Sequence, residues 1–322
     1  MIKLKHSTVD LFTNIQGSIK EYMLVVRSKD CAPGTIEKYQ YHLNLWKVWM
    51  ESEGMRTLDE VTTFSLRKWN ANIHETTGWA AATVRLAVTI VRTFLNWCYQ
   101  ERRCEDLGRV LIVPKLKQKT ERTLTSEEVA KLFQVCDDSI EGIRDAAIVA
   151  MLYDTGFRAS ELCDLQLDDL YLNQKMRHKG IVYQVNYGVV KIKGGDDEAG
   201  WFGEETKDLL QKWLDVRPSA AKLYENAVFV AIGGNTPGKS LTRSGLRDIV
   251  RRLGTASDIS GVTPHAFRRG FTIAMDNAGA SDNLKAKFGR WKSTIMIRRY
   301  TRAQKVGWQF KEYSPVKNLQ ND

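Results

Sequence analysis

Several features that would place this chain of 322 residues in a common class are missing from its sequence. No stretch approaches the roughly 18 to 20 apolar residues that cross a bilayer, and the first ten residues, MIKLKHSTVD, contain no apolar signal segment. The five cysteines are an odd number and include no C-x-x-C pair, which argues against a disulfide framework and a zinc site. We therefore expect a soluble, cytoplasmic protein without a membrane segment, whose cysteines are reduced and mostly in the core.

What the chain does have is positive charge. Lys and Arg outnumber Asp and Glu by 48 to 38, which gives a formal net charge of +10 and a pI near 9.3. Such an excess attracts polyanions, and nucleic acid is the leading candidate partner. An ordinary basic surface, or a patch for anionic lipid, remains an alternative. Since 43% of the residues are apolar, the chain is long and apolar enough for two folded domains.

The first hundred residues are predicted to be helical. Apolar residues recur at steps of three and four from residue 35 to residue 50, and again in a second strong helix from about residue 80 to residue 103. Weaker helical patterns cover about 14–29 and 63–76. Together they predict a small four-helix domain over residues 1–110.

Residues 111–122 contain Pro114, which stops a helix, and three alternating lysines, Lys115, Lys117 and Lys119. We interpret this segment as an extended basic linker. An ordinary solvated linker explains the pattern equally well, although lysines next to a polyanion would each release about one counterion.

A second domain is predicted over residues 123–303, with a tail over 304–322. It begins at a capping box formed by Thr125 and Glu128, and helical patterns follow. Helices are expected near 126–154, 160–165, 204–216, 242–253, 264–277, 282–288 and 294–301. Between them, GIVYQVNYGVVKIKGG alternates and is rich in Val, Ile and Tyr, which is typical of paired strands. The fold class is therefore mainly α with a small antiparallel β-sheet.

Arg158 follows a glycine-containing turn and precedes a helix start that Ser160 is expected to cap. An arginine there stands beside free helix amides, where a phosphate binds readily, and Glu161 is placed to orient its guanidinium. A plain surface ion pair between the two is the competing interpretation.

Lys193 precedes two glycines at the end of a strand-like stretch, so its ammonium is expected at a hairpin tip. A solubilising charge on a turn is the commoner role of such a lysine. Asp196, Asp197 and Glu198 follow, but consecutive residues in regular structure do not all face one ion. We therefore predict no metal here.

His265 and Arg268 stand three residues apart after the first proline of a predicted helix, and hence on one face. An imidazole beside a guanidinium is suited to proton transfer at a phosphate, although a lone histidine is more often structural.

Further on, Trp291 is followed nine residues later by Tyr300, which has arginines on both sides. A phenol attacks poorly unless cations stabilise its anion, yet a tyrosine among arginines is also common in simple stacking.

The order of these elements is more specific than any one of them. R-x-S-E-L, a lysine at a strand turn, H-x-x-R, and G-x-W with Y-T-R nine residues beyond the tryptophan resemble the tyrosine recombinases of the phage integrase family. The stretches GTIEKYQYHLNLWKVW and AAATVRLAVTIVRTFLNWC resemble the main helices of that family's core-binding domain. The resemblance thus covers most of the chain.

The resemblance implies a role for each matched position. Arg158 and Arg268 would hold the scissile phosphate, His265 would act as base, and Lys193 would protonate the leaving 5′ oxygen. Trp291, where many members have a second histidine, would orient the phosphate, and Tyr300 would form a 3′-phosphotyrosine. Tyr313 is a rival nucleophile outside the motif.

The resemblance also implies partners. These are double-stranded DNA with specific recombination sites, a homotetramer on that DNA that is a monomer or weak oligomer when free, and a possible directionality factor. No cofactor or ATP is implied. Candidate DNA contacts are Thr35, Lys38, Arg85, Arg92, Lys115, Lys117, Arg243 and Arg247.

Two departures from the family pattern bear on these assignments. The acidic turn of residues 196–198 would repel a phosphate and leaves Lys191 as an alternative to Lys193, and tryptophan donates a hydrogen bond but does not shuttle protons. Three other functions stay open, namely a type IB topoisomerase, a telomere resolvase and a DNA-binding regulator without activity. Integration, excision and resolution of a DNA element are not distinguished.

Overall fold

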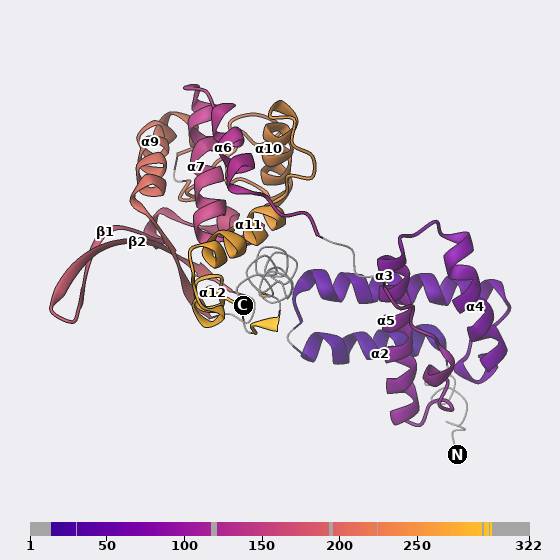
Figure 1. Ribbon diagram of the computed structural model, residues 1–322. Helices are drawn as coiled ribbons and strands as arrows, with labels where there is room; N and C mark the ends of the chain where they lie inside the picture. Colours follow the sequence, from indigo (N-terminus) through magenta and orange to yellow (C-terminus); the bar gives the residue numbers. More distant parts are fainter. Residues whose placement is uncertain are drawn as a thin grey trace, which may run out of the picture. The chain divides into compact units, whose positions relative to one another are not determined.

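The computed structural model describes residues 14–29, 31–116, 121–192, 196–223, 225–291, 293–295 and 297. The chain divides into two compact units, residues 1–119 and residues 120–322. The division falls within the predicted linker. The helical unit is coloured indigo to purple in Figure 1, and the unit that contains the sheet is coloured magenta to yellow.

In the described residues of the first unit there are four α-helices: α2 (Ile15–Ser28), α3 (Pro33–Ser52), α4 (Thr63–Thr76) and α5 (Ala81–Gln100). The four predicted helices are therefore confirmed, with ends that differ by at most three residues. The predicted apolar face of α5 is buried, and on α3 the residues Leu43, Trp46 and Met50 are fully buried. These residues meet in one core to which α2 and α4 also contribute.

The segment after α5 differs from the expected free linker. A short 3₁₀ turn covers Gly108–Val110, and Leu111 is only 1% exposed, in the core of the helical unit. Arg85 of α5 donates a hydrogen bond to the Pro114 carbonyl at 2.6 Å. The start of the predicted linker is therefore packed onto the first unit because its apolar residues complete that core.

The second unit is built around α7 (Ile140–Thr155), an apolar helix that packs against neighbours from distant parts of the chain. Around it lie α6 (Ser126–Gln134), α9 (Glu204–Ala220) and α11 (Pro264–Asn277) (Figure 1). The described part of this unit also contains the helices α8 (Ala159–Asp164), α10 (Arg243–Ala256) and α12 (Asp282–Phe288). The predicted capping box is present at the start of α6, where the Thr125 hydroxyl accepts from the Glu128 amide.

The sheet has three antiparallel strands in the order β1 (Leu170–His178), β2 (Ile181–Lys191) and β3 (Asp197–Phe202). The alternating stretch seen in the sequence corresponds to β2. Its partners β1 and β3 are more polar and carry the weaker pattern. The β1–β2 hairpin extends well away from the helices in Figure 1.

Three further features concern the described part of the chain. No helix there is long and apolar enough to cross a membrane, and no group of three or more potential metal ligands occurs within it. All five cysteines are free. Two of them, Cys98 and Cys163, are buried, and the other three are partly buried, so the core holds fewer than expected.

Candidate active site

The candidate site begins at the sharp turn that connects α7 to α8. Gly156 ends α7 with a left-handed φ of 60°, and a Cβ at this position would lie 2.6 Å from the ring of Phe271. Both constraints require glycine. The turn brings the chain back so that Arg158 occupies the N-cap of α8, with 34% of its side chain exposed.

Glu161, rather than Ser160, completes the start of α8. Its carboxylate accepts from the Arg158 backbone amide at 2.9 Å and also pairs with the Arg158 guanidinium. The expectation of a Ser160 cap is therefore wrong. The N-cap position falls two residues earlier, and a glutamate three residues beyond the cap reaches back to its amide.

Glu161 is 3% exposed and lies near three guanidiniums. Besides Arg158, Arg290 lies 3.3 Å from one carboxylate oxygen and Arg268 lies 3.8 Å from the same oxygen. Burial alone would raise the pKa of Glu161, but Arg290, the Arg158 amide and the other guanidiniums together lower it. One ionised carboxylate thus sits among three cations, which leaves an excess of positive charge for an anionic ligand.

Arg268 is held in place from two sides. It is 5% exposed, on α11, and its guanidinium donates to the backbone carbonyls of Gly156 and Gly289. The guanidinium carbon also stands 4.3 Å from the ring centroid of Trp291. These bonds fix the group before any ligand arrives, as a preorganised donor requires.

Arg290 is a site residue that the sequence reasoning missed. It is 4% exposed and has a left-handed φ of 55°. Its guanidinium donates to the carbonyls of Thr155 and Phe288 and lies 4.7 Å from the centroid of the Phe157 ring. Arg290 stands between Gly289 and Trp291 in the sequence, and no linear pattern shows that its side chain reaches back to the α7–α8 turn.

His265 lies at the surface on the first turn of α11, partly shielded by its neighbours. This partial burial lowers its pKa, and the guanidiniums of Arg269, Arg268 and Arg158 lower it further, in that order. The imidazole is therefore neutral at pH 7, close to both arginines that the sequence assigned to the phosphate. It is in the form that accepts a proton.

Trp291 completes the described part of this cluster. The Trp291 ring, which covers the Arg268 guanidinium, also stacks on the ring of Phe271 in α11, with 6.4 Å between the ring centroids. Four of the six predicted catalytic residues, Arg158, His265, Arg268 and Trp291, are thus brought together from three separate segments. Their roles remain predictions.

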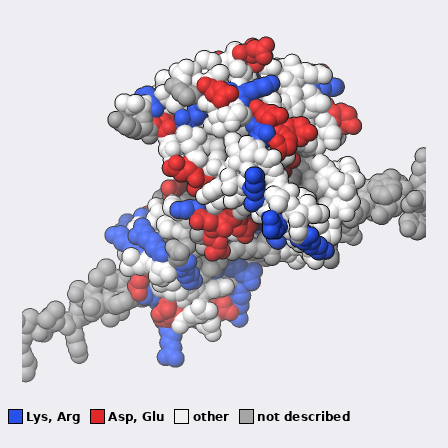
Figure 2. All heavy atoms as spheres, turned by 90° about the vertical axis from the view of Figure 1, so that its left-hand side faces the viewer, with Lys and Arg blue, Asp and Glu red and all other residues white. Residues whose placement is uncertain are grey.

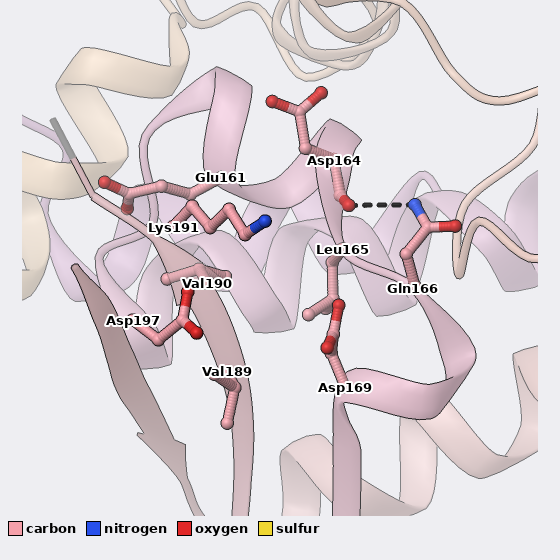
Figure 3. Close-up of a pocket in the computed structure, with 9 residues that line it drawn as sticks. All are labelled: Glu161, Asp164, Leu165, Gln166, Asp169, Val189, Val190, Lys191 and Asp197. Atoms are coloured by element: carbon pink, nitrogen blue, oxygen red, sulfur yellow. Dashed lines mark hydrogen bonds between the residues drawn. The ribbon is translucent and has the colours of Figure 1, made fainter. Parts of the chain in front are cut away.

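The other two predicted catalytic residues, Lys193 and Tyr300, lie outside the described residues, as does Tyr313. The alternative Lys191 is described, at the end of β2. It helps to line a pocket of 250 Å³ with Glu161, Asp164, Asp169 and Asp197, and its ammonium points into that pocket in Figure 3. The choice between the two lysines therefore stays open.

The predicted DNA contacts are mostly exposed, as such contacts must be. Lys38, Arg85, Arg92, Lys115, Arg243 and Arg247 are exposed, Thr35 is half-buried, and Lys117 lies outside the described residues. Arg243 begins α10, which packs against α8, and it acts electrostatically on Cys163 of that helix. Of the two candidates on α10, Arg243 is therefore the one that interacts with α8, the helix whose N-cap is Arg158.

As a whole, the cluster offers fixed donors around an anion and a neutral base beside them. The guanidiniums of Arg158, Arg268 and Arg290 surround Glu161, the Trp291 ring covers the Arg268 guanidinium, and all but Arg290 of these arginines lower the pKa of His265. Such donors stabilise the charge that develops on a phosphate during substitution. The geometry therefore fits phosphoryl transfer.

Comparison with known families agrees with this geometry. Residues 122–306 match the model described as "Phage integrase family", and residues 19–102 match "Phage integrase, N-terminal SAM-like domain". The catalytic-domain match alone covers more than half of the chain. Both matches fall within the two units of the structure.

Individual relatives and structures agree as well. The chain is 28% identical to tyrosine recombinase XerD of Ralstonia nicotianae over 77% of each chain, and 25% identical to XerD of Staphylococcus haemolyticus over 81% of this chain and 85% of the relative. The fold resembles XerH recombinase bound to a difH substrate, with a TM-score of 0.70, 16% identity and 98% coverage of both chains. It also resembles a lambda integrase dimer on a core site, with a TM-score of 0.65, 17% identity and 92% and 81% coverage. The chain belongs to the phage integrase family of tyrosine recombinases.

Proposed function

We propose that the arginine cluster around Glu161 binds the scissile phosphate of duplex DNA and that Tyr300 attacks it. As a member of its family, the chain is a tyrosine-type site-specific recombinase. The observation that carries the proposal is the convergence of Arg158, Arg268 and Trp291 beside a neutral His265. A positive excess fixed by buried hydrogen bonds suits an anion with developing charge.

The reaction is a substitution at phosphorus. The Tyr300 oxygen forms a bond to phosphorus while the bond to the 5′ oxygen of the DNA breaks. His265 accepts the phenol proton, and Lys193 donates a proton to the leaving 5′ oxygen. Arg158, Arg268 and the Trp291 indole hold the nonbridging oxygens, and Glu161 orients the arginines.

The product is a 3′-phosphotyrosine and a free 5′-hydroxyl. Because the ester preserves the energy of the broken bond, a 5′-hydroxyl from another strand reverses the step and rejoins the DNA without ATP. No cofactor is required by this scheme. We propose double-stranded DNA with specific sites as the partner and a homotetramer as the active assembly, with an accessory directionality factor as a further partner.

A nicked suicide duplex tests the chemistry directly. Candidate sites are first selected for tight binding from a random-sequence DNA library, and the nicked duplexes are then incubated with protein and resolved on denaturing gels. Wild type should form a covalent adduct that Tyr300→Phe does not form. An adduct that persists in this variant would contradict the assignment, and Tyr313→Phe would then be tested.

A regulator that kept the fold but lost the chemistry gives a different result. It would bind the selected duplexes and form no adduct on any of them. A type IB topoisomerase would form the adduct and relax supercoiled plasmids that carry no selected site. Recombination between two plasmid-borne sites separates the proposed function from that alternative.

A further inference from the structure

The outer part of the β1–β2 hairpin is not covered by the rest of the described chain. Every residue from 173 to 184 is exposed, on both strands and at the turn. The turn itself is tight, since Lys179 and Gly180 both have positive φ, 48° and 81°, as in the two-residue turns that match the strand twist. The hairpin is therefore a regular, two-stranded ribbon that projects into solvent (Figure 1).

The strand register gives this ribbon two unlike faces. Lys175 lies opposite Gln184, and Arg177 lies opposite Val182. Opposed residues share a face, and neighbours along a strand alternate, so both cations point to the same side. The other side carries the pairs Met176 with Tyr183 and His178 with Ile181.

The hairpin is also free of negative charge. The sequence from residue 170 to residue 195 contains no Asp or Glu. Figure 2 views the molecule from the side toward which the hairpin projects, and acidic as well as basic clusters are visible on that face. The lack of carboxylates is thus a property of the hairpin rather than of its surroundings.

We propose that the cationic face of this hairpin, Lys175, Arg177 and Gln184, contacts the phosphate backbone of duplex DNA outside the cleavage site. The proposal rests on the proposed function for its DNA partner. Lys and Arg carry only donors, and neither residue forms an ion pair with the described residues, so both are available to phosphate oxygens. A two-stranded ribbon is also narrow enough to follow a DNA groove.

The position of the hairpin makes such a contact compatible with cleavage. β2 runs without interruption from the hairpin turn to Val190 and Lys191, which line the pocket beside Glu161 (Figure 3). Lys191 stands nine positions after Val182, the partner of Arg177, which corresponds to about 30 Å of strand. The hairpin would therefore extend the DNA contact by up to about that distance from the site.

The salt dependence of DNA binding tests the proposal. Phosphate contacts are sequence-independent, so the probe is a duplex of about 40 base pairs of arbitrary sequence. Replacing Lys175 and Arg177 together by Gln should reduce the slope of log K against log salt by about 2, since each contact contributes about 1. An unchanged slope would overturn the proposal.

Two matched variants make the result specific. The first control is a double variant, Lys131→Gln and Lys212→Gln, which removes the same amount of charge from exposed positions on α6 and α9. It should leave the slope of log K against log salt nearly unchanged. Ile181→Thr with Tyr183→Thr alters the apolar face and should also leave it unchanged. A slope that falls as far in either control as in the Lys175 and Arg177 pair contradicts a contact through the cationic face.

The suicide-substrate assay separates this proposal from the proposed function. At saturating protein, the Lys175→Gln and Arg177→Gln pair should form the covalent adduct to the wild-type extent, because neither residue touches the cluster around Glu161. If wild type forms no adduct, the proposed chemistry fails while the slope measurement still decides the hairpin. Loss of the adduct in the hairpin variant at saturation would contradict a role limited to DNA contact.

Discussion

The two units differ in how many charged residues they bury. In the described residues, every buried Arg, Lys, Asp or Glu lies in the second unit, whereas the buried polar residues of the helical unit are Ser18, His42 and Ser65. Burying a charge is costly unless it is paired. In the described residues of the helical unit, the Arg103 side chain is only 8% exposed and pairs with Glu21, whereas Lys38, Arg85 and Arg92 are exposed.

Within the second unit, buried cations differ in the number of carboxylates that they face. Lys285 is completely buried and pairs with two carboxylates, Asp276 and Asp282, so its positive charge is fully compensated. Around Glu161, three guanidiniums share one carboxylate. A compensated cation such as Lys285 suits a structural role, whereas the uncompensated positive charge around Glu161 suits an anionic ligand.

Removing Glu161 should produce the largest effect. Glu161→Ala leaves three guanidiniums, two of them buried, without their carboxylate, and breaking a buried pair typically costs about 3 to 5 kcal/mol. Urea unfolding should show a loss of that size, together with loss of the covalent adduct. In the helical unit, Glu51→Ala removes the exposed carboxylate of the Lys47–Glu51 pair and should cost less than about 1 kcal/mol. Equal losses would contradict the distinction between the units.

Arg158 tests chemistry without the same structural cost, because its side chain is 34% exposed. Arg158→Ala should slow adduct formation by about 10²- to 10³-fold, as is typical when one such donor is lost. Its urea midpoint should change far less than that of Glu161→Ala. If Arg158→Ala forms the adduct at a rate within a few-fold of wild type, the proposed role of Arg158 in binding the phosphate is contradicted.

The pH dependence of cleavage tests His265. Its folded pKa is lowered from the usual histidine value by partial burial and by neighbouring arginines, so the imidazole becomes protonated only at a lower pH than an unperturbed histidine. The cleavage rate should therefore begin to fall at a lower pH than the ordinary histidine pKa predicts, when the base becomes protonated. His265→Gln should lower the rate and abolish this acid limb. An acid limb that persists in the variant would assign it to another group.

The smallest effect is expected on the surface of the helical unit. Arg92→Gln removes an exposed cation from α5, and it should reduce the salt slope of DNA binding by about 1 without changing the cleavage rate at saturation. Glu101→Gln, at an exposed acidic position just beyond the same helix, serves as the control and should not reduce the slope. A cleavage defect at saturating Arg92→Gln would contradict the division of roles between the two units.

Much of the fold followed from local patterns. The apolar spacing predicted the helices of the first unit, and the Thr125 capping box marked the start of the second, because helix formation depends on residues three and four apart. Strand β2 was recognisable from a different local pattern, the alternation of its Val, Ile and Tyr residues with a period of two. The polar strands β1 and β3 were not located, because they lack a clear alternation of apolar residues. They are strands because they form hydrogen bonds with β2.

The sequence by itself determined which residue types stand at the site and in which order, through Arg158, the His265 and Arg268 pair, and Trp291. Only the tertiary structure decided how they are held. Arg290 contacts Glu161, which is 129 positions earlier in the chain. Leu111, which was assigned to the linker, packs into the core of the helical unit. Such contacts depend on which segments pack together, because burial and ion pairing act through space and leave no periodic signal along the chain.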